Sequence, residues 1–355
     1  LTPSPIIMSN LPHTFDPDAP AQPGAGIFGL PFTRDDAAIV LIPVPFDATT
    51  SYSTGASHGP RIILDASAQV DLYDHQFGRI YERGIFMEDI PQDILELSAH
   101  TRTLTQPIIE RGGATPDDAH SVAQIDKAGD RIRAFTHERT IAALRDGKIP
   151  AIIGGEHSVP LGTLDAIAEH LEDQRFSILH IDAHLDLRTA FDGFRYSHAS
   201  IMHNALADIP AIERLVSVAI RDYSEGERAA ADEAGNRVAV HYDLDLHRQL
   251  DEGAAWSELC ERIVNQLTDR VYISFDIDAL DPALCPHTGT PVPGGLSFNH
   301  AARLLEILAR SGKRILGFDL VEVAPNPANE DDEWDANVGA RILYKLCGTA
   351  LTANR

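Results

Sequence analysis

The chain has 355 residues, of which 44% are hydrophobic and 23% charged, as is ordinary for a globular protein with a large buried core. Its 53 acidic and 29 basic residues give a net charge of −24, which argues against nucleic-acid and anionic-membrane partners. No apolar run approaches the roughly 20 residues that span a bilayer, and the first ten residues lack the features of a signal peptide. The three cysteines are widely spaced and form no C-x-x-C pair, which fits a reducing, cytoplasmic location.

The first 34 residues are rich in Pro, Gly and Ala and show no hydrophobic periodicity. This composition predicts an irregular N-terminal arm that wraps the surface or a neighbouring subunit. Residues 35–355 contain no further low-complexity segment, so we expect a single domain there.

Eight short apolar runs follow the arm. They are continuous and rich in β-branched residues, as expected for strands buried on both faces of a parallel sheet. The runs cover residues 38–44, 85–87, 151–153, 177–181, 215–220, 238–240, 271–275 and 315–318. Helical periodicity lies between them, most clearly over residues 132–144, 159–171, 256–267 and 300–308. Gly147 and Pro150 read as stop signals for the first of these helices. The alternation predicts one α/β domain with helices on both faces of the sheet.

Polar clusters follow five of the predicted strands directly. They occupy residues 154–158, 182–186, 221–224, 276–282 and 321–325. Ligands of open parallel sheets bind outside the carboxyl ends of the strands, so we expect these clusters to converge on one site.

Two of the clusters carry a repeated acidic spacing. Asp182, His184 and Asp186 alternate, and if strand geometry continues beyond residue 181, their side chains point the same way. Asp276 and Asp278 repeat the spacing on another strand. Any one motif could be a helix cap or a solvated turn. The third motif is His157 after Gly-Gly-Glu, and the three motifs together, each after a strand, favour metal binding.

Four carboxylates packed together would repel one another and raise their own pKa values unless cations separate them. The residues divide between two ions that would share Asp182 and Asp276 as bridging carboxylates. One ion would be held by His157, Asp182, Asp186 and Asp276, and the other by Asp182, His184, Asp276 and Asp278. Oxygen ligands with two imidazoles suit two Mn²⁺ ions better than a thiolate-binding metal, with Ni²⁺ and Co²⁺ as alternatives.

Several motifs together resemble the ureohydrolase family, which comprises arginases, agmatinases, formiminoglutamases and guanidino-acid hydrolases. The matching segments are 45–47 leading to 59–60, 154–158, 182–186, 274–282, 288–292 with 294–296, and 321–325. The resemblance spans about residues 38 to 346 and is nearest to agmatinase-like members. It implies a three-layer αβα arginase-like fold with an eight-stranded parallel sheet, so that residues 35–355 form a single catalytic domain. It also implies a dinuclear manganese centre and a homotrimer or homohexamer.

The resemblance also assigns roles within the reaction. Glu322 would hold a small cationic guanidino substrate through paired charge-assisted hydrogen bonds. His198 would be a mobile histidine that carries a proton to the leaving amine. Asp186 and Asp278 are expected metal ligands that could also accept the proton of the water shared by the two ions. Thr288 and Thr290 would orient Glu322, and His180 is interpreted as a buried structural residue.

The far end of the substrate is less defined. The expected reaction converts agmatine to putrescine and urea, because residues 187–196 lack the polar segment of arginases. The Ser-Tyr-x-x-Gly stretch at residues 51–55 also resembles agmatinases, although Ser-Thr stands where Arg-Pro is common. Alternatives are guanidinobutyrate or another guanidino acid, guanidine or a small alkylguanidine, and a formiminoglutamase. Arg188 or Arg195 could bind a substrate carboxylate, and Arg195 and Tyr196 are expected contacts of the substrate tail. A compact aromatic pocket could instead be formed by Phe191, Phe194, Tyr196 and Trp334.

Two other classes remain as rivals. A single-zinc deacetylase would need only one metal and would leave His157, Asp186 and Asp278 surplus. A non-catalytic subunit usually loses ligands, whereas this chain keeps all six.

Overall fold

The computed structural model describes residues 11–12, 15–22 and 24–355. Its eight strands form one sheet in the order β2-β1-β3-β8-β7-β4-β5-β6, and all neighbouring strands are parallel. Their bounds are β1 Ile39–Val44, β2 Ile85–Met87, β3 Ile149–Gly154, β4 Phe176–Ile181, β5 Ile212–Ile220, β6 Val238–Tyr242, β7 Arg270–Asp276 and β8 Arg314–Val321. Each corresponds to one of the predicted apolar runs.

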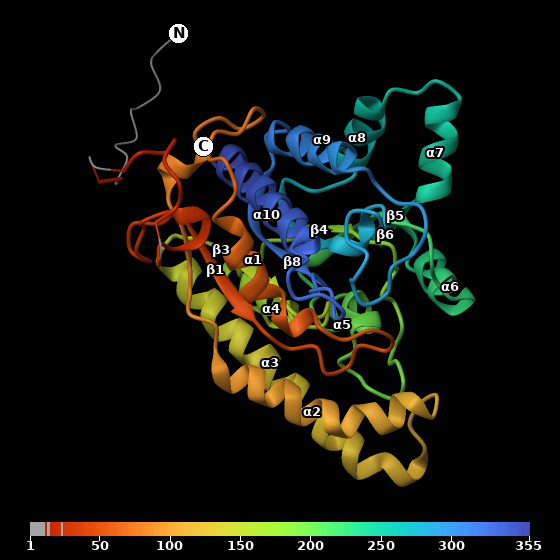
Figure 1. Cartoon of the computed structure of the whole chain (residues 1–355). Helices are drawn as coiled ribbons and strands as arrows, with labels where there is room; N and C mark the ends of the chain where they lie inside the picture. The colour runs from red at the N-terminus through yellow and green to blue at the C-terminus, as the bar shows by residue number, and fades with distance from the viewer. Residues whose placement is uncertain (1–10, 13–14, 23) are drawn as a thin grey trace.

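Helices cover both faces of the sheet, which confirms the three-layer αβα architecture (Figure 1). One layer contains α1 Gly59–Ser67, α8 Trp256–Val264, α9 Phe298–Ala309 and α10 Trp334–Ala353. The other contains α3 Ala119–Arg145, α4 Leu161–Leu171 and α5 Ile201–Asp208, with α2 Gln92–Glu110 packed along α3. The short helices α6 Glu225–Glu233 and α7 Asp243–Asp251 follow β5 and β6.

Strands β1 and β4 are buried along their whole length because a helical layer lies on each side. All six residues of β1 and of β4 are buried, and their inward faces alternate between the two helical layers. This double burial explains why the strands are continuous apolar runs rather than alternating ones. Pro150, expected as a stop signal after a helix, is instead the second residue of β3, a position near the start of a strand that proline tolerates.

Helices depart more from expectation than strands do. Helix α3 begins at Ala119, well before the predicted start at Ile132. Helix α10 was not predicted, because 14 of its 20 residues are buried and it lacks a simple polar face. Helix α2 was also missed, and it contains Pro107 only three residues before its end.

The end of the predicted N-terminal arm packs against the domain. Ile27, Phe28 and Leu30 are buried in the core, and the Phe28 ring meets the ring of Tyr344 in α10 at 4.8 Å between centroids. Residues 1–10, which belong to the same predicted arm, lie outside the described residues. Among the residues that are described, no helix is both long and apolar enough to cross a membrane.

Four central strands lie side by side in the order β3-β8-β7-β4. They come from two separated parts of the chain, residues 149–181 and 270–321, yet their parallel direction brings their carboxyl ends to one edge. The candidate site lies at this edge.

Candidate metal centre and substrate pocket

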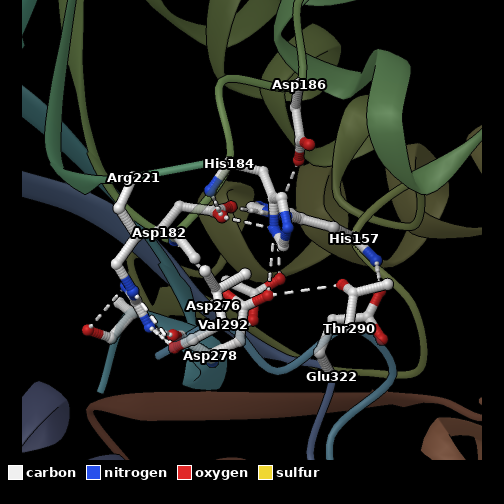
Figure 2. Close-up of polar contacts among 12 residues, drawn as sticks. His157, Asp182, His184, Asp186, Arg221, Asp276, Asp278, Thr290, Val292 and Glu322 are labelled. Atoms are coloured by element: carbon white, nitrogen blue, oxygen red, sulfur yellow. Dashed lines mark hydrogen bonds and ion pairs between the residues drawn. The ribbon is translucent and has the colours of Figure 1, made fainter. Parts of the chain in front are cut away.

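All six predicted metal ligands meet at the carboxyl edge of the central strands, beside Glu322 (Figure 2). His157 follows β3, and Glu322 directly follows β8. The other five ligands lie at or just beyond the ends of β4 and β7, and they are Asp182, His184, Asp186, Asp276 and Asp278. Five of the six are buried, and His184 is partly exposed.

The imidazole of His157 is the centre of the first half of the cluster. Its Nδ1 lies 2.9 Å from Asp182 Oδ2, 3.1 Å from Asp186 Oδ2 and 3.3 Å from Asp276 Oδ2. Nevertheless this buried Nδ1 forms no hydrogen bond within the described part of the chain, while Nε2 is bonded to Ser274 Oγ at 2.8 Å. A free ring nitrogen facing several carboxylate oxygens, with its other nitrogen anchored, is the arrangement of a metal-binding histidine.

His184 is the centre of the second half. Its Nδ1 lies 3.0 Å from Asp278 Oδ2 and 3.5 Å from Asp182 Oδ1. Two groups of potential ligand atoms can therefore be distinguished, and Asp182 belongs to both. His180 also lies within reach of the first group, but its Nε2 is hydrogen-bonded to Asp182 Oδ2 at 2.8 Å and its Nδ1 to Ser217 Oγ at 3.1 Å. It is fully buried inside β4, as expected of a structural residue.

The local backbone differs from the extended geometry that the alternating pattern suggested. Strand β4 ends at Ile181, and Asp182 Oδ1 then accepts a hydrogen bond from the amide of His184 at 2.6 Å. Asp276 at the end of β7 accepts one from the amide of Asp278 at 2.8 Å. These turns, in which an aspartate bonds to the amide two residues ahead, explain the Asp-x-His and Asp-x-Asp spacing. They direct the side chains into one cluster without a continuing strand.

Two site residues have strained backbones. Asp186 has φ 52° and Glu322 has φ 64°, in the left-handed region that residues other than glycine rarely occupy. Such conformations concentrate at functional sites, where the surrounding structure holds them.

The cluster carries more negative charge than a buried site tolerates alone. Burial, together with the neighbouring charges of Asp278 and Asp182, holds the pKa of Asp276 well above its usual range. Although burial opposes it, the charges of Asp278 and Asp182 raise the pKa of His184 to about 12. Bound cations would relieve this repulsion and replace the protons, so the donor set fits divalent metal ions.

The carboxylate of Glu322 faces the cluster with one oxygen occupied and one free. Oε1 accepts a hydrogen bond from the amide of His157 at 2.8 Å, whereas Oε2 is buried with no hydrogen-bond partner in the described residues. A side chain on Gly289 would come within 3.1 Å of Oε2, so glycine leaves space beside this oxygen, although Glu322 itself does not line the pocket described next. Thr288 Oγ1 donates to the Glu322 carbonyl at 2.9 Å, but Thr290 reaches Asp278 Oδ2 at 3.5 Å rather than Glu322.

A pocket of about 170 Å³ opens over the cluster. This volume is below the roughly 300–1,000 Å³ of common small-molecule sites, so the pocket suits a small substrate. It is lined by Ser51, His184, Asp186, Arg188, Phe191, His198, Ala199, Asp222, Tyr223, Glu227 and Thr290. The pocket therefore places His198 beside the candidate ligands, and burial and the nearby charge of His184 lower the pKa of His198.

Other residues expected at the substrate tail lie elsewhere. Arg195 pairs with Asp208 at 2.9 Å, and the Tyr196 hydroxyl donates to Asp130 at 2.7 Å, so both side chains pack against helices rather than line the pocket. Phe194 is buried among apolar residues of α2 and α3, and the Trp334 indole donates to the Ala283 carbonyl at 3.0 Å. Of the expected aromatic pocket, only Phe191 lines this cavity.

The sequence assigned no individual role to Arg221, Glu227 or Ser51, although Ser51 belongs to the agmatinase-like segment 51–55. Arg221 donates to the carbonyls of Asp278 at 2.7 Å and Val292 at 2.9 Å, which fixes the loop after β7 (Figure 2). Glu227 binds Arg188 at 3.4 Å, and Ser51 lies in the loop after β1. The position of Arg221 in a polar cluster after a strand was the only signal for it, and nothing in the sequence marked Glu227.

Comparisons with known proteins agree with this geometry. The Arginase family matches residues 37–348. An N(1)-aminopropylagmatine ureohydrolase of Thermus thermophilus is 34% identical over 321 residues, 88% of this chain and 90% of that protein. An agmatinase of Pyrococcus horikoshii is 29% identical over 317 residues, 88% and 92% of the two chains. The crystal structure of the agmatine ureohydrolase of Thermoplasma volcanium has a TM-score of 0.67 and 25% identity, covering 90% of this chain and 92% of that one.

The chain thus belongs to the arginase family, whose fold and carboxylate-rich site it shares. Its relatives place it among the agmatinase-like amidinohydrolases of that family.

Proposed function

We propose that this enzyme hydrolyses the guanidinium group of agmatine to release urea and putrescine. The observation that carries the proposal is the convergence of three carboxylates on the unbonded Nδ1 of His157, beside the free Oε2 of Glu322. The first feature provides ligands for cations, and the second provides a buried acceptor for a cationic substrate.

Two Mn²⁺ ions are the proposed cofactors. His157, Asp182, Asp186 and Asp276 would hold one, and Asp182, His184, Asp276 and Asp278 the other. The two clusters of potential ligand atoms share Asp182, which supports a carboxylate that would serve both ions. Asp276 is in neither cluster, and its support is the 3.3 Å distance of its Oδ2 from His157 Nδ1. When bound, such ions supply water activation by lowering the pKa of a water molecule towards neutrality.

The protein's own groups would perform the remaining work. Oε2 of Glu322 would accept hydrogen bonds from the guanidinium, while Oε1 stays fixed by the amide of His157. Asp186, at the pocket floor, would accept a proton from the attacking water. The imidazole of His198, which lines the pocket, would pass a proton to the leaving amine.

The pocket wall supports a substrate with a cationic tail. The exposed carboxylate of Asp222 has neither an ion pair nor a hydrogen bond with the described residues. Arg188, the candidate receptor for a substrate carboxylate, is already paired with Glu227. The net charge of this wall is therefore negative, which favours agmatine over guanidino acids. N(1)-aminopropylagmatine, the substrate in the name of the Thermus relative, carries a longer cationic tail and is the second candidate.

A urea-release screen with Mn²⁺-loaded protein tests the proposal. We expect the highest kcat/KM with agmatine, followed by N(1)-aminopropylagmatine, and less than a tenth of that value with guanidinobutyrate, arginine, guanidine and methylguanidine. The screen is repeated with Ni²⁺ and Co²⁺ to identify the preferred metal. Absence of urea from every substrate and metal would overturn the proposal, and one metal ion per chain would contradict the dinuclear site.

We also propose that the chain assembles as a homotrimer or homohexamer. The support is the family resemblance. Light scattering of the purified protein measures the mass directly.

A further inference from the structure

His198 is held by a side chain from a distant part of the chain. Its Nε2 lies 3.1 Å from the hydroxyl of Ser51, 147 residues away. A serine hydroxyl can both donate and accept, so it can match either protonation state of an imidazole nitrogen. Both residues line the pocket over the candidate metal ligands.

The loop that carries Ser51 is anchored from outside the pocket. Arg102 in α2 donates to the carbonyl of Thr50 at 2.7 Å, and the hydroxyl of Thr105 donates to the carbonyl of Ala48 at 2.6 Å. The amide of Ser53 donates to the carbonyl of Gly289 at 3.2 Å. The hydroxyl of Ser51 therefore has a defined place, although the residue itself lies at a partly exposed turn.

A second contact braces the same imidazole. The rings of Phe191 and His198 lie 6.3 Å apart at 70°, an edge-to-face arrangement. Phe191 is fixed in turn by the Arg188 guanidinium, 4.6 Å from the ring centre, and by paired backbone hydrogen bonds with Phe194.

Arg188 is itself tied to the scaffold. Glu227 pairs with it at 3.4 Å and is only 5% exposed. The carboxylate of Glu227 also accepts hydrogen bonds from the amide and hydroxyl of Ser224 at the start of α6. Contacts therefore run from Glu227 to Arg188, from Arg188 to Phe191 and from Phe191 to the ring of His198. Ser51 contacts the same ring.

We propose that Ser51 is the positioning residue of His198, fixing the imidazole edge that faces the substrate, with Phe191 and Arg188 bracing the ring. The inference rests on the proposed function, in which His198 donates a proton to the leaving amine. A serine that only fixes this ring affects proton transfer and not substrate binding, and it has no effect once His198 is absent.

A double-mutant cycle separates this role from a general structural one. With the metal-loaded enzyme and its best guanidino substrate, Ser51→Ala is expected to lower kcat about 10-fold and to leave KM within about 2-fold, since a hydrogen bond of about 1.4 kcal/mol is lost. Ser51→Thr keeps the hydroxyl and should remain within about 3-fold of the wild type. In a His198→Ala background, Ser51→Ala should cause no further loss.

Ser57→Ala is the matched control. It makes the same change six residues further on, in the 3-10 helix Ala56–His58. Its side chain does not line the pocket over the metal ligands, and its hydroxyl forms no hydrogen bond with the described residues. This variant should keep the wild-type kcat. Losses that multiply in the double variant, or an unchanged kcat in Ser51→Ala, would overturn the inference.

A spectroscopic measurement makes the test independent of turnover. In protein loaded with diamagnetic Mg²⁺ and ¹³C-labelled histidine, the ring signal of His198 is assigned by its loss in His198→Ala. Ser51→Ala should shift or broaden this signal, and Ser57→Ala should not. An unmoved signal contradicts the positioning role even if the wild type releases urea, whereas a moved signal without any urea release would count against the proposed reaction alone.

Discussion

One oxygen of the Glu322 carboxylate accepts a 2.8 Å hydrogen bond from the backbone amide of His157, and the other is buried without a partner among the described residues. This bond joins the ends of β3 and β8 and prevents the carboxylate from rotating. The free oxygen is therefore held at a fixed place beside the candidate metal ligands. A buried carboxylate oxygen without a hydrogen bond lowers the stability of the fold, which favours a functional role for Glu322 over a structural one.

Replacing Glu322 tests that role. Glu322→Gln removes the charge but keeps a similar shape, so kcat/KM for agmatine should fall about 100-fold, equivalent to about 2.7 kcal/mol of lost charge-assisted hydrogen bonding. Elemental analysis should still find two metal ions per chain, because Glu322 is not a proposed ligand. A variant with unchanged kcat/KM would contradict a guanidinium contact at this oxygen.

Removal of metal should destabilise the fold as well as abolish activity. Without cations, the carboxylates of Asp182, Asp186, Asp276 and Asp278 repel one another inside a buried cluster, so chelation should lower Tm by several degrees and Mn²⁺ should restore it. Thermal unfolding measures this effect. His184→Ala and Asp276→Ala should each abolish urea release and show little response of Tm to Mn²⁺. Full activity in either variant after chelation would contradict a dinuclear centre.

The metal-free protein should lose stability as pH rises. Burial raises the pKa of Glu156 to about 8 and holds the pKa values of Asp276 and Glu322 well above their usual range. In the native state these groups keep protons that the unfolded chain releases above about pH 4.5, so the free energy of unfolding falls between about pH 5 and pH 8.

Thermal unfolding from pH 5.5 to pH 8.5 measures this dependence. We expect Tm of the chelated protein to decline over the range and that of the Mn²⁺-loaded protein to decline less, because a bound ion replaces the proton of Asp276. A rising Tm in the chelated protein would show that the buried carboxylates are ionised without metal.

A pair of arginine variants distinguishes substrate selection from bracing. If Arg188 braces Phe191 against His198, Arg188→Met should lower kcat about 3- to 10-fold for every substrate that is turned over. If Arg188 instead bound a substrate carboxylate, the loss would appear as a higher KM for guanidinobutyrate only. Arg195→Met is the matched control. Arg195 pairs with Asp208 outside the pocket, so kinetics should be unchanged.

A glycine in α3 supports the segment that precedes His198. A side-chain carbon on Gly129 would lie 2.4 Å from the ring of Tyr196, too close for the two to coexist without movement. Gly129→Ala should therefore destabilise the protein by about 2 kcal/mol in denaturant unfolding. The control is Gly226→Ala in α6, where the nearest atom is 4.0 Å away, and it should be neutral or slightly stabilising. Equal effects of the two substitutions would contradict tight packing at Gly129.

The sequence was most informative where chemistry and burial coincide. The eight strands were predictable because strands buried on both faces form continuous apolar runs. The clustering of the six proposed ligands was predictable because each lies at or just after the end of a strand of one parallel sheet. Helix α10 was not, because burial on all sides removes the periodicity on which helix prediction depends. Arg195 was misplaced because its sequence position next to Tyr196 says nothing about Asp208, its partner in α5. Ser51 and Glu227 reach the pocket only through tertiary contacts.

The sheet order also constrains when the site can be completed during biosynthesis. The strands that carry it stand in the order β3-β8-β7-β4, so the two interior strands are synthesised last. A nascent chain exposes His157 and the three acidic or histidine residues after β4 at least 90 residues before Asp276. The space between β3 and β4 is filled only when residues 270–321 have emerged. Ion capture at the complete site must therefore follow translation of nearly the whole chain. An enzyme built in this way acquires its metal as one of the last events of its maturation.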